Sequence, residues 1–239
     1  MDLILIPGAW LDASSWDQIT PALEAAGHRV HALTLPGLES VDADRSGIGL
    51  ADHIDAVVKA IDAIDAEKVV LVGHSAGGAI AYGVTDRRPD RVARVVYVDS
   101  VPLGEGDNVN DHLPVVNGEV PLPDWAVFDD EDVVDLDDTL RASVRARAIP
   151  EPLGVLTDPQ RLSDERRYDV PGTVIACEYP AAVHRDLIAK DEDYTRELGR
   201  LHNYEIVDLP TGHWPQFTKP AELAQAILDA VAKSSIERP

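Results

Sequence analysis

A serine flanked by glycines, between an apolar run and a small-residue helix start, constrains this chain more than any other feature. The segment 73–77, with the sequence GHSAG, follows the apolar run 69–72 and precedes a stretch of glycine and alanine. A strand that turns sharply into a helix needs glycine at the turn, because larger side chains would collide with the neighbouring backbone. Such a turn raises the serine hydroxyl above the strand end and places it at the N-terminus of the helix. The pattern therefore predicts that Ser75 is a nucleophile.

Apolar runs and helical patterns alternate along most of the chain. This alternation favours an α/β fold class, a mostly parallel sheet with helices on both faces. The chain of 239 residues is long enough for one such domain. Strands are predicted at 3–6, 29–34, 68–72, 92–98, 171–177 and 204–209, and helices from about residue 14, over 50–65, after the serine turn and over 221–231.

Residues 102–167 break the alternation and are rich in proline. A structureless loop of that length is anomalous inside a compact domain. We therefore predict a core of residues 1–101 and 168–239 and an inserted cap or lid of residues 102–167, helical around 136–148. Such a cap would lie over the carboxyl ends of the strands, where open α/β sheets bind their ligands.

Charge and composition exclude several classes of partner. The chain carries 43 acidic and 21 basic residues, a net charge of −22. A surface this negative repels nucleic-acid phosphates and anionic lipids. We therefore expect a small-molecule substrate and no nucleic-acid or membrane partner. The oligomeric state is left open, with a homodimer as one alternative.

Cysteine usage and hydropathy bound the location and the metal chemistry. The single cysteine, Cys177, excludes an internal disulfide and a cysteine-based metal cluster, and it is interpreted as a small buried hydrophobe. The acidic run 129–132 is interpreted as a solvated helix start, so neither a metal nor a cofactor is expected. No apolar run reaches the ~18 residues of a membrane span, and segment 1–7 lacks the basic region of a signal peptide. A cytoplasmic location is the default expectation.

A serine nucleophile needs a general base and donors for the oxyanion. His213 is the predicted base, because it follows the last predicted strand and Gly212 lets the loop turn the imidazole back across the sheet. The predicted oxyanion donors are backbone N–H groups. One belongs to Ala76, directly after the nucleophile, and the other to Ala9 in the loop after the first strand, with Trp10 as the alternative.

At these motifs the chain resembles the α/β-hydrolase superfamily. The segments LILIPGAW at 3–10 and LEAAGHRV at 23–30, together with Trp16 and the serine turn, look most like the plant methyl-esterase and hydroxynitrile-lyase group. The segments VYVDS at 96–100 and GHWP at 212–215 are similar to actinobacterial hydrolases of this superfamily. The resemblance covers the predicted core, roughly residues 1–100 and 170–233, and much less of the cap.

Three positions depart from the pattern of the family. Pro7 stands where the family usually has a histidine beside the oxyanion loop. Trp214 stands where hydroxynitrile lyases carry a lysine, which disfavours cyanohydrin cleavage. Tyr179 aligns with the usual catalytic aspartate and cannot supply a carboxylate.

Two residues are candidates for the displaced acid. Asp99 ends the preceding strand, a position from which some relatives, such as certain haloalkane dehalogenases, supply their acid. Glu178 is one residue before the usual site, and in an extended segment its side chain would point the opposite way. Asp99 is therefore the favoured acid and Glu178 the alternative, and a site in which neither is the acid stays open.

The resemblance and the candidate triad imply a cofactor-free serine hydrolase. We expect it to cleave a small, mostly uncharged ester or lactone through an acyl-enzyme on Ser75. Two alternatives stay open at this point. One is different chemistry in the same site, namely C–C bond hydrolysis, a lyase step or perhydrolysis. The other is a ligand-binding receptor that keeps the fold.

Overall fold

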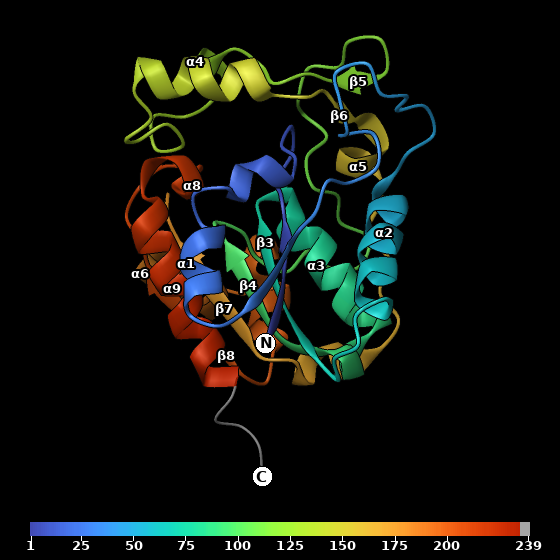
Figure 1. The fold of residues 1–239 in the computed structure, drawn as a ribbon, viewed down its shortest axis with the longest axis vertical. Helices are drawn as coiled ribbons and strands as arrows, with labels where there is room; N and C mark the ends of the chain where they lie inside the picture. The colour runs from blue at the N-terminus through green and yellow to red at the C-terminus, as the bar shows by residue number, and fades with distance from the viewer. Residues whose placement is uncertain (235–239) are drawn as a thin grey trace.

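Six strands form one parallel sheet, as Figure 1 shows for the computed structural model, which describes residues 1–234. The order across the sheet is β2-β1-β3-β4-β7-β8, and every neighbouring pair runs parallel. The central strands are buried on both faces, which is why they read as nearly continuous apolar runs. The predicted α/β fold class is confirmed. The strands are β1 (Asp2–Ile6), β2 (Arg29–Ala32), β3 (Val69–His74), β4 (Val92–Val98), β7 (Gly172–Ala176) and β8 (Tyr204–Asp208).

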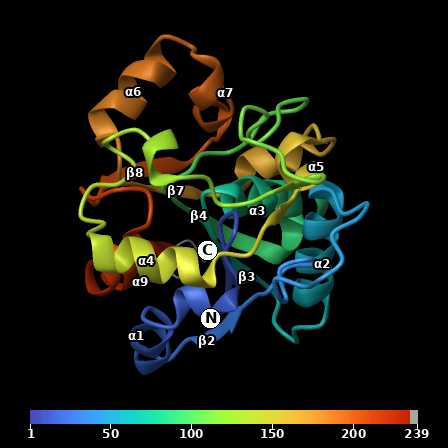
Figure 2. The same ribbon diagram turned by 90° about the horizontal axis from the view of Figure 1, so that it is seen from above.

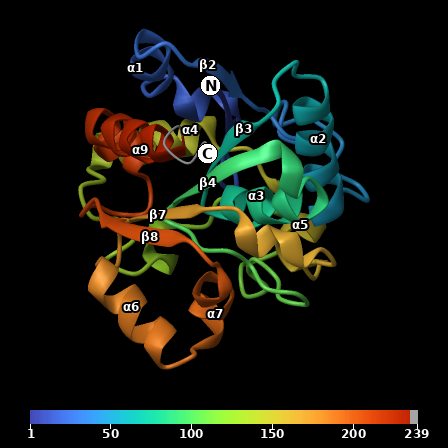
Figure 3. The same ribbon diagram turned by 90° about the horizontal axis from the view of Figure 1, so that it is seen from below.

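Helices cover both faces of this sheet (Figure 3). Side chains alternate along a strand, so Leu3 and Leu5 pack on one face and Ile4 and Ile6 on the other. The first face is covered by α1 (Thr20–Ala25) and α9 (Pro220–Ser234), and the second by α2 (Leu50–Asp62) and α3 (Ala76–Arg87). A short 3-10 helix, η2 (Pro89–Arg91), connects α3 to β4.

The first helix begins later than the sequence predicts. A 3-10 helix, η1 (Ala13–Trp16), comes first, and its first turn is capped by the Asp12 side chain, which accepts from Ser14 N at 2.9 Å. The α-helix α1 starts only at Thr20, with Pro21 in its first turn. Proline lacks an N–H and fits the first turn of a helix but not its interior, so it separates the two helices.

The cap lies over the carboxyl ends of the strands (Figures 1 and 2). Its main helix α4 confirms the helix predicted around 136–148, and Asp137 caps it by accepting from Leu140 N at 2.8 Å. The acidic run 129–132 lies in turns that precede α4 rather than in the first turn of that helix. The cap elements are β5 (Glu119–Val120), η3 (Trp125–Val127), α4 (Asp138–Arg147), β6 (Glu151–Pro152) and α5 (Leu153–Thr157). The next element, η4 (Glu165–Asp169), begins within the predicted cap but lies at the amino ends of the strands, where Arg166 and Arg167 pair with Asp90 and Asp86 near the C-terminal end of α3.

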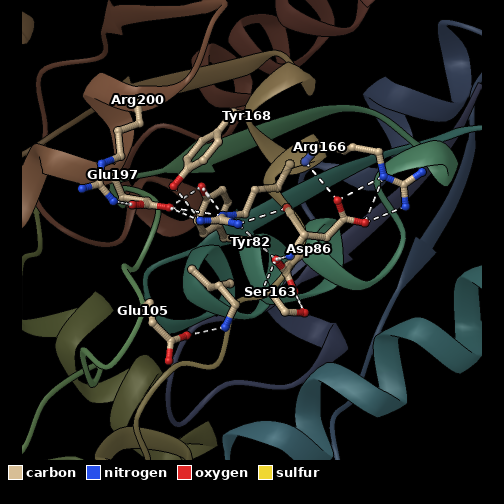
Figure 4. A network of polar contacts seen from close by, with 11 residues as sticks. Tyr82, Asp86, Glu105, Ser163, Arg166, Tyr168, Glu197 and Arg200 are labelled. Carbon is tan, nitrogen blue, oxygen red and sulfur yellow. Dashed lines mark hydrogen bonds and ion pairs between the residues drawn. The ribbon is translucent and has the colours of Figure 1, made fainter.

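Two helices inserted between β7 and β8, α6 (Ala181–Ala189) and α7 (Asp193–Arg200), lie beyond the β8 edge of the sheet (Figure 2). A buried polar network, drawn in Figure 4, joins α7 to α3. Arg167 of η4 is at its centre and donates to Tyr82 Oη at 3.1 Å, Asp86 Oδ1 at 3.3 Å and Glu197 Oε1 at 3.2 Å. None of the helices within residues 1–234 is long and apolar enough to cross a membrane.

Candidate active site

The predicted nucleophile occupies a strained turn between β3 and α3. Ser75 has φ 52° and ψ −123°, a conformation that non-glycine residues rarely adopt outside constrained sites. Glycine at position 77 lets the start of α3 pack directly against the end of β1. A Cβ at Gly77 would lie 2.5 Å from Ile6 O. Ser75 N donates to Val98 O at 3.1 Å, which fixes the turn against β4.

The structure places His213 next to this serine. His213 Nε2 lies 2.8 Å from Ser75 Oγ. The loop that carries His213 is held by the cap, since His213 N donates to Asp132 O at 2.7 Å and Gly212 N donates to Val134 O at 3.1 Å. A short helix, α8 (Pro215–Thr218), follows directly. The arrangement is that of a serine hydroxyl and the base that accepts its proton.

Both candidate acids reach the same nitrogen of His213. Asp99 Oδ2 lies 2.7 Å from Nδ1, and Glu178 Oε1 lies 2.8 Å from it. Asp99 Oδ1 accepts two peptide N–H groups, from Cys177 at 2.9 Å and from Glu178 at 3.1 Å. The expectation that Glu178 points away from His213 is wrong. The strand β7 ends at Ala176 and the chain bends over 177–179, so the alternation of an extended strand no longer applies there.

The environment of the two carboxyl groups separates their roles. Burial opposes ionisation of Asp99, but the hydrogen bonds from His213 and the two peptide N–H groups hold its pKa below the usual value. Burial raises the pKa of Glu178 to about 7, and the nearby Asp99 charge also raises it. Burial favours the neutral His213 ring, but its bonds to both carboxyl groups raise the pKa of His213 overall. Asp99 is thus the ionised partner of His213 near neutral pH.

Backbone N–H groups for an oxyanion are found on both sides of Ser75. The loop after β1 passes close to the nucleophile, since a Cβ at Gly8 would lie 3.1 Å from Ser75 Cβ. Within residues 1–234, the N–H groups of Ala9 and Ala76 donate to no protein acceptor. Trp10, the alternative donor, is not free to serve, because its N–H already donates to Glu151 Oε2 at 2.9 Å. Ala9 and Ala76 are therefore the candidate donors.

Glu151 is a residue of this site that sequence reasoning did not identify. It lies in β6 of the cap, is 1 % exposed, and contacts a loop 141 residues away in the sequence. Its only sequence signal is a carboxylate between two prolines, and this pattern is also typical of exposed loops.

A cavity of about 510 Å³ opens from Ser75 and His213. Apolar side chains from the segment after β4 line it together with Ala79 of α3 and Tyr194 of α7. No lysine or arginine from residues 1–234 lines the cavity, whereas Asp99, Asp107 and Asp193 are among its lining residues.

Two other sequence-based interpretations concern thiol and metal chemistry. Cys177 is 4 % exposed, and burial raises the pKa of its thiol well above the usual range, so it is the buried hydrophobe that the sequence predicted. Asp99, Glu178 and His213 are the residues whose ligand atoms lie close enough to hold a metal ion, within 4.8 Å of one another among the described residues. Their 2.7 and 2.8 Å contacts are those of hydrogen-bonded groups.

Comparison with known proteins agrees with the fold. The family model described as "Alpha/beta hydrolase family" matches residues 3–226. A carbendazim hydrolyzing esterase from Nocardioides sp. (strain SG-4G) is 33% identical over 114 residues, which is 47% of this chain and 47% of that protein. This chain thus aligns with about half the length of that relative.

Two further similarities extend over nearly the whole chain. Methylesterase 3 of Arabidopsis thaliana is 25% identical over 262 residues, covering 97% of this chain and 96% of that protein. The solved structure of an extracellular alpha/beta-hydrolase from a Paenibacillus species superposes with a TM-score of 0.77 at 21% identity, covering 96% of this chain and 98% of that one. At this identity the structural likeness shows the fold.

Proposed function

We propose that this chain, which belongs to the alpha/beta hydrolase family, hydrolyses carboxylic esters through an acyl-enzyme on Ser75. The observation that carries the proposal is the hydrogen-bonded series Ser75–His213–Asp99, with contacts of 2.8 and 2.7 Å. The names of its relatives, which include an esterase and a methylesterase, support the same reaction.

The geometry supports a two-step reaction. Ser75 Oγ attacks the ester carbonyl while His213 Nε2 takes its proton, and Asp99 stabilises the imidazolium that forms. The N–H groups of Ala9 and Ala76 are placed to stabilise the negative oxygen of the tetrahedral intermediate. His213 then gives the proton to the leaving alcohol. Water attacks the acyl-enzyme by the same route, releasing the acid and restoring Ser75.

The cavity favours a small and mostly uncharged ester or lactone. Its volume of about 510 Å³ is in the lower part of the range of small-molecule sites. An anionic substrate would lie near the acidic residues Asp99 and Asp107, with no lysine or arginine among the described residues that line the cavity. The net charge of −22 adds a weaker, longer-range repulsion.

The test combines covalent labelling with a substrate panel. A fluorophosphonate should label the protein on Ser75, and Ser75→Ala should prevent labelling. A panel of esters and lactones of graded acyl length, each with an anionic counterpart, should show turnover of the neutral members. A protein that neither labels nor turns over any ester would refute the proposal and favour a binding role for the cavity.

A further inference from the structure

A buried carboxyl group of the cap binds the backbone of the oxyanion loop, and the triad chemistry does not use it. Glu151 of β6 is 1 % exposed, and its Oε2 accepts the N–H of Trp10 at 2.9 Å. A buried carboxyl group is costly unless its environment compensates for it. Its retention at this contact therefore calls for a role at the loop.

The cap holds Trp10 at three points. Besides the Glu151 bond, Ile149 N donates to Trp10 O at 2.9 Å, and Trp10 Nε1 donates to Val120 O at 2.9 Å. Trp10 has φ 67°, in the left-handed region that side chains other than glycine rarely adopt. Such a conformation persists only where surrounding contacts enforce it. Among these three contacts, Glu151 is the only side chain bound to the Trp10 backbone.

The surroundings of Glu151 suit a carboxyl group that keeps its proton. Burial raises the pKa of Glu151 to about 8, although the Trp10 N–H and the Arg45 charge lower it. The other oxygen, Oε1, lies 3.9 Å from His53 Nδ1. His53 Nε2 lies 2.8 Å from Pro36 O, an acceptor, so Nε2 carries the ring proton and Nδ1 is an acceptor. His53 Nδ1 has no hydrogen-bond partner within residues 1–234, so a proton on Oε1 would face a buried acceptor.

We propose that Glu151 is a positioning residue for the oxyanion loop, acting as a hydrogen-bond acceptor that fixes the Ala9–Trp10 peptide. This inference rests on the proposed hydrolase function. The Ala9 N–H belongs to the preceding peptide, and the Glu151 bond limits rotation of the backbone between the two. Loss of that bond frees the Trp10 conformation and lets the Ala9 donor move away from the developing oxyanion.

The expected effect is on the chemical step rather than on substrate binding. Oxyanion donors act on charge that develops in the transition state, so their misplacement lowers kcat more than it raises KM. Removal of one such donor costs ~10²–10³ in kcat. Because the Ala9 N–H would be displaced rather than deleted, a loss of about 10- to 100-fold is expected when Glu151 no longer reaches Trp10.

Three substitutions test this on the full chain. Glu151→Gln keeps an acceptor for the Trp10 N–H and a donor toward His53, so kcat should stay within about threefold of the native value. Glu151→Leu removes the acceptor, and Glu151→Asp withdraws the carboxyl group by one methylene. Both should lose about 10- to 100-fold in kcat with KM changed less than threefold. The Asp variant keeps a carboxyl group and adds no side-chain volume to the buried site. It therefore tests the positioning role even if the Leu variant does not fold.

Two further measurements separate positioning from general stability. Amide hydrogen exchange should show a protected Trp10 N–H in the native and Gln proteins and faster exchange in the Asp protein. A boronic acid, which forms a tetrahedral adduct with serine, should bind the Asp protein at least tenfold more weakly, while fluorophosphonate still labels it.

Native-like kcat in the folded Asp protein, or a loss in the Gln protein equal to that in the Asp protein, would overturn the role of Glu151. Neither outcome affects the hydrolase proposal, because that proposal stands or falls on labelling and ester turnover by the native protein.

Discussion

Replacing Asp99 with asparagine is expected to reverse the tautomer of His213. The Oδ1 position of Asp99 accepts peptide N–H groups from Cys177 at 2.9 Å and Glu178 at 3.1 Å. An asparagine at this position keeps those two bonds only if its carbonyl oxygen takes the Oδ1 place. Its NH2 group then faces His213 Nδ1, which must become an acceptor. The ring proton moves to Nε2, and Nε2 can no longer take the proton of Ser75.

The second carboxyl group sets the size of the loss. The wrong tautomer in a comparable triad costs ~10⁴ in kcat, which corresponds to ~5.4 kcal/mol at ~1.36 kcal/mol per factor of ten. Here Glu178 Oε1 also lies 2.8 Å from Nδ1 and can accept its proton in the productive tautomer. We therefore expect Asp99→Asn to lose ~10²–10⁴ in kcat. Glu178→Gln leaves Asp99 in place and should lose less than ~10-fold.

The assay is a double-mutant cycle. Steady-state kcat and KM are measured for the native protein, each single variant and the double variant, with the best substrate from the ester panel. The double variant keeps no carboxylate at Nδ1 and should fall to the full ~10⁴ loss. Circular dichroism and fluorophosphonate labelling control for unfolding and for access to Ser75.

Two outcomes would refute this reasoning. A larger loss in Glu178→Gln than in Asp99→Asn would make Glu178 the acid of the triad. Mild losses in both single variants and in the double variant would mean that Ser75 and His213 act as a dyad.

Three further predictions test the site and its support. Ser75→Ala should lower ester turnover by several orders of magnitude without changing the circular dichroism spectrum, because members of a triad act as a unit; near-native kinetics would end the hydrolase interpretation. Glu178→Gln should move the acidic limb of the kcat/KM–pH profile to lower pH. The Glu178 contact raises the pKa of His213, and the ring must be neutral to act as the base. An acidic limb at unchanged pH would show that it reports a group other than His213. Arg167→Leu should lower the free energy of unfolding by ~3–5 kcal/mol in urea titration, because it removes the buried guanidinium that pairs with both Asp86 and Glu197. A change below ~1 kcal/mol would show that the network in Figure 4 contributes little.

The sheet and the placement of Ser75 beside His213 could be predicted because their signals are local. Strands β3 and β4 are buried on both faces, so each appears as an apolar run whatever its neighbours are. The serine turn depends on glycines within two residues of Ser75. His213 follows from its place after the last strand. The first helix was placed too early, because the Asp12 cap and Pro21 favour a 3-10 turn before α1.

The acid and the oxyanion support could not be predicted in the same way, because they depend on distant contacts. The expectation that Glu178 points away from His213 assumes that side chains alternate along an extended chain. The chain bends after Ala176, so this alternation does not hold at Glu178. The choice between the Ala9 and Trp10 N–H groups depends on Glu151, which lies 141 residues further along the chain.

Two parts of the molecule surround Ser75, a part of the cap that holds the loops of His213 and Trp10 and a second part that lines the cavity. The cap backbone at Asp132 binds the loop of His213, and the cap segment 149–151 binds Trp10, so an opening that moved this part of the cap would break bonds on both sides of Ser75. The cavity is instead lined by residues 101–109 after β4 and by Asp193 and Tyr194 of α7, and these two segments lie side by side in Figures 2 and 3. Changes in substrate preference can therefore arise in this second part, where they leave the contacts of His213 and of the oxyanion loop unchanged.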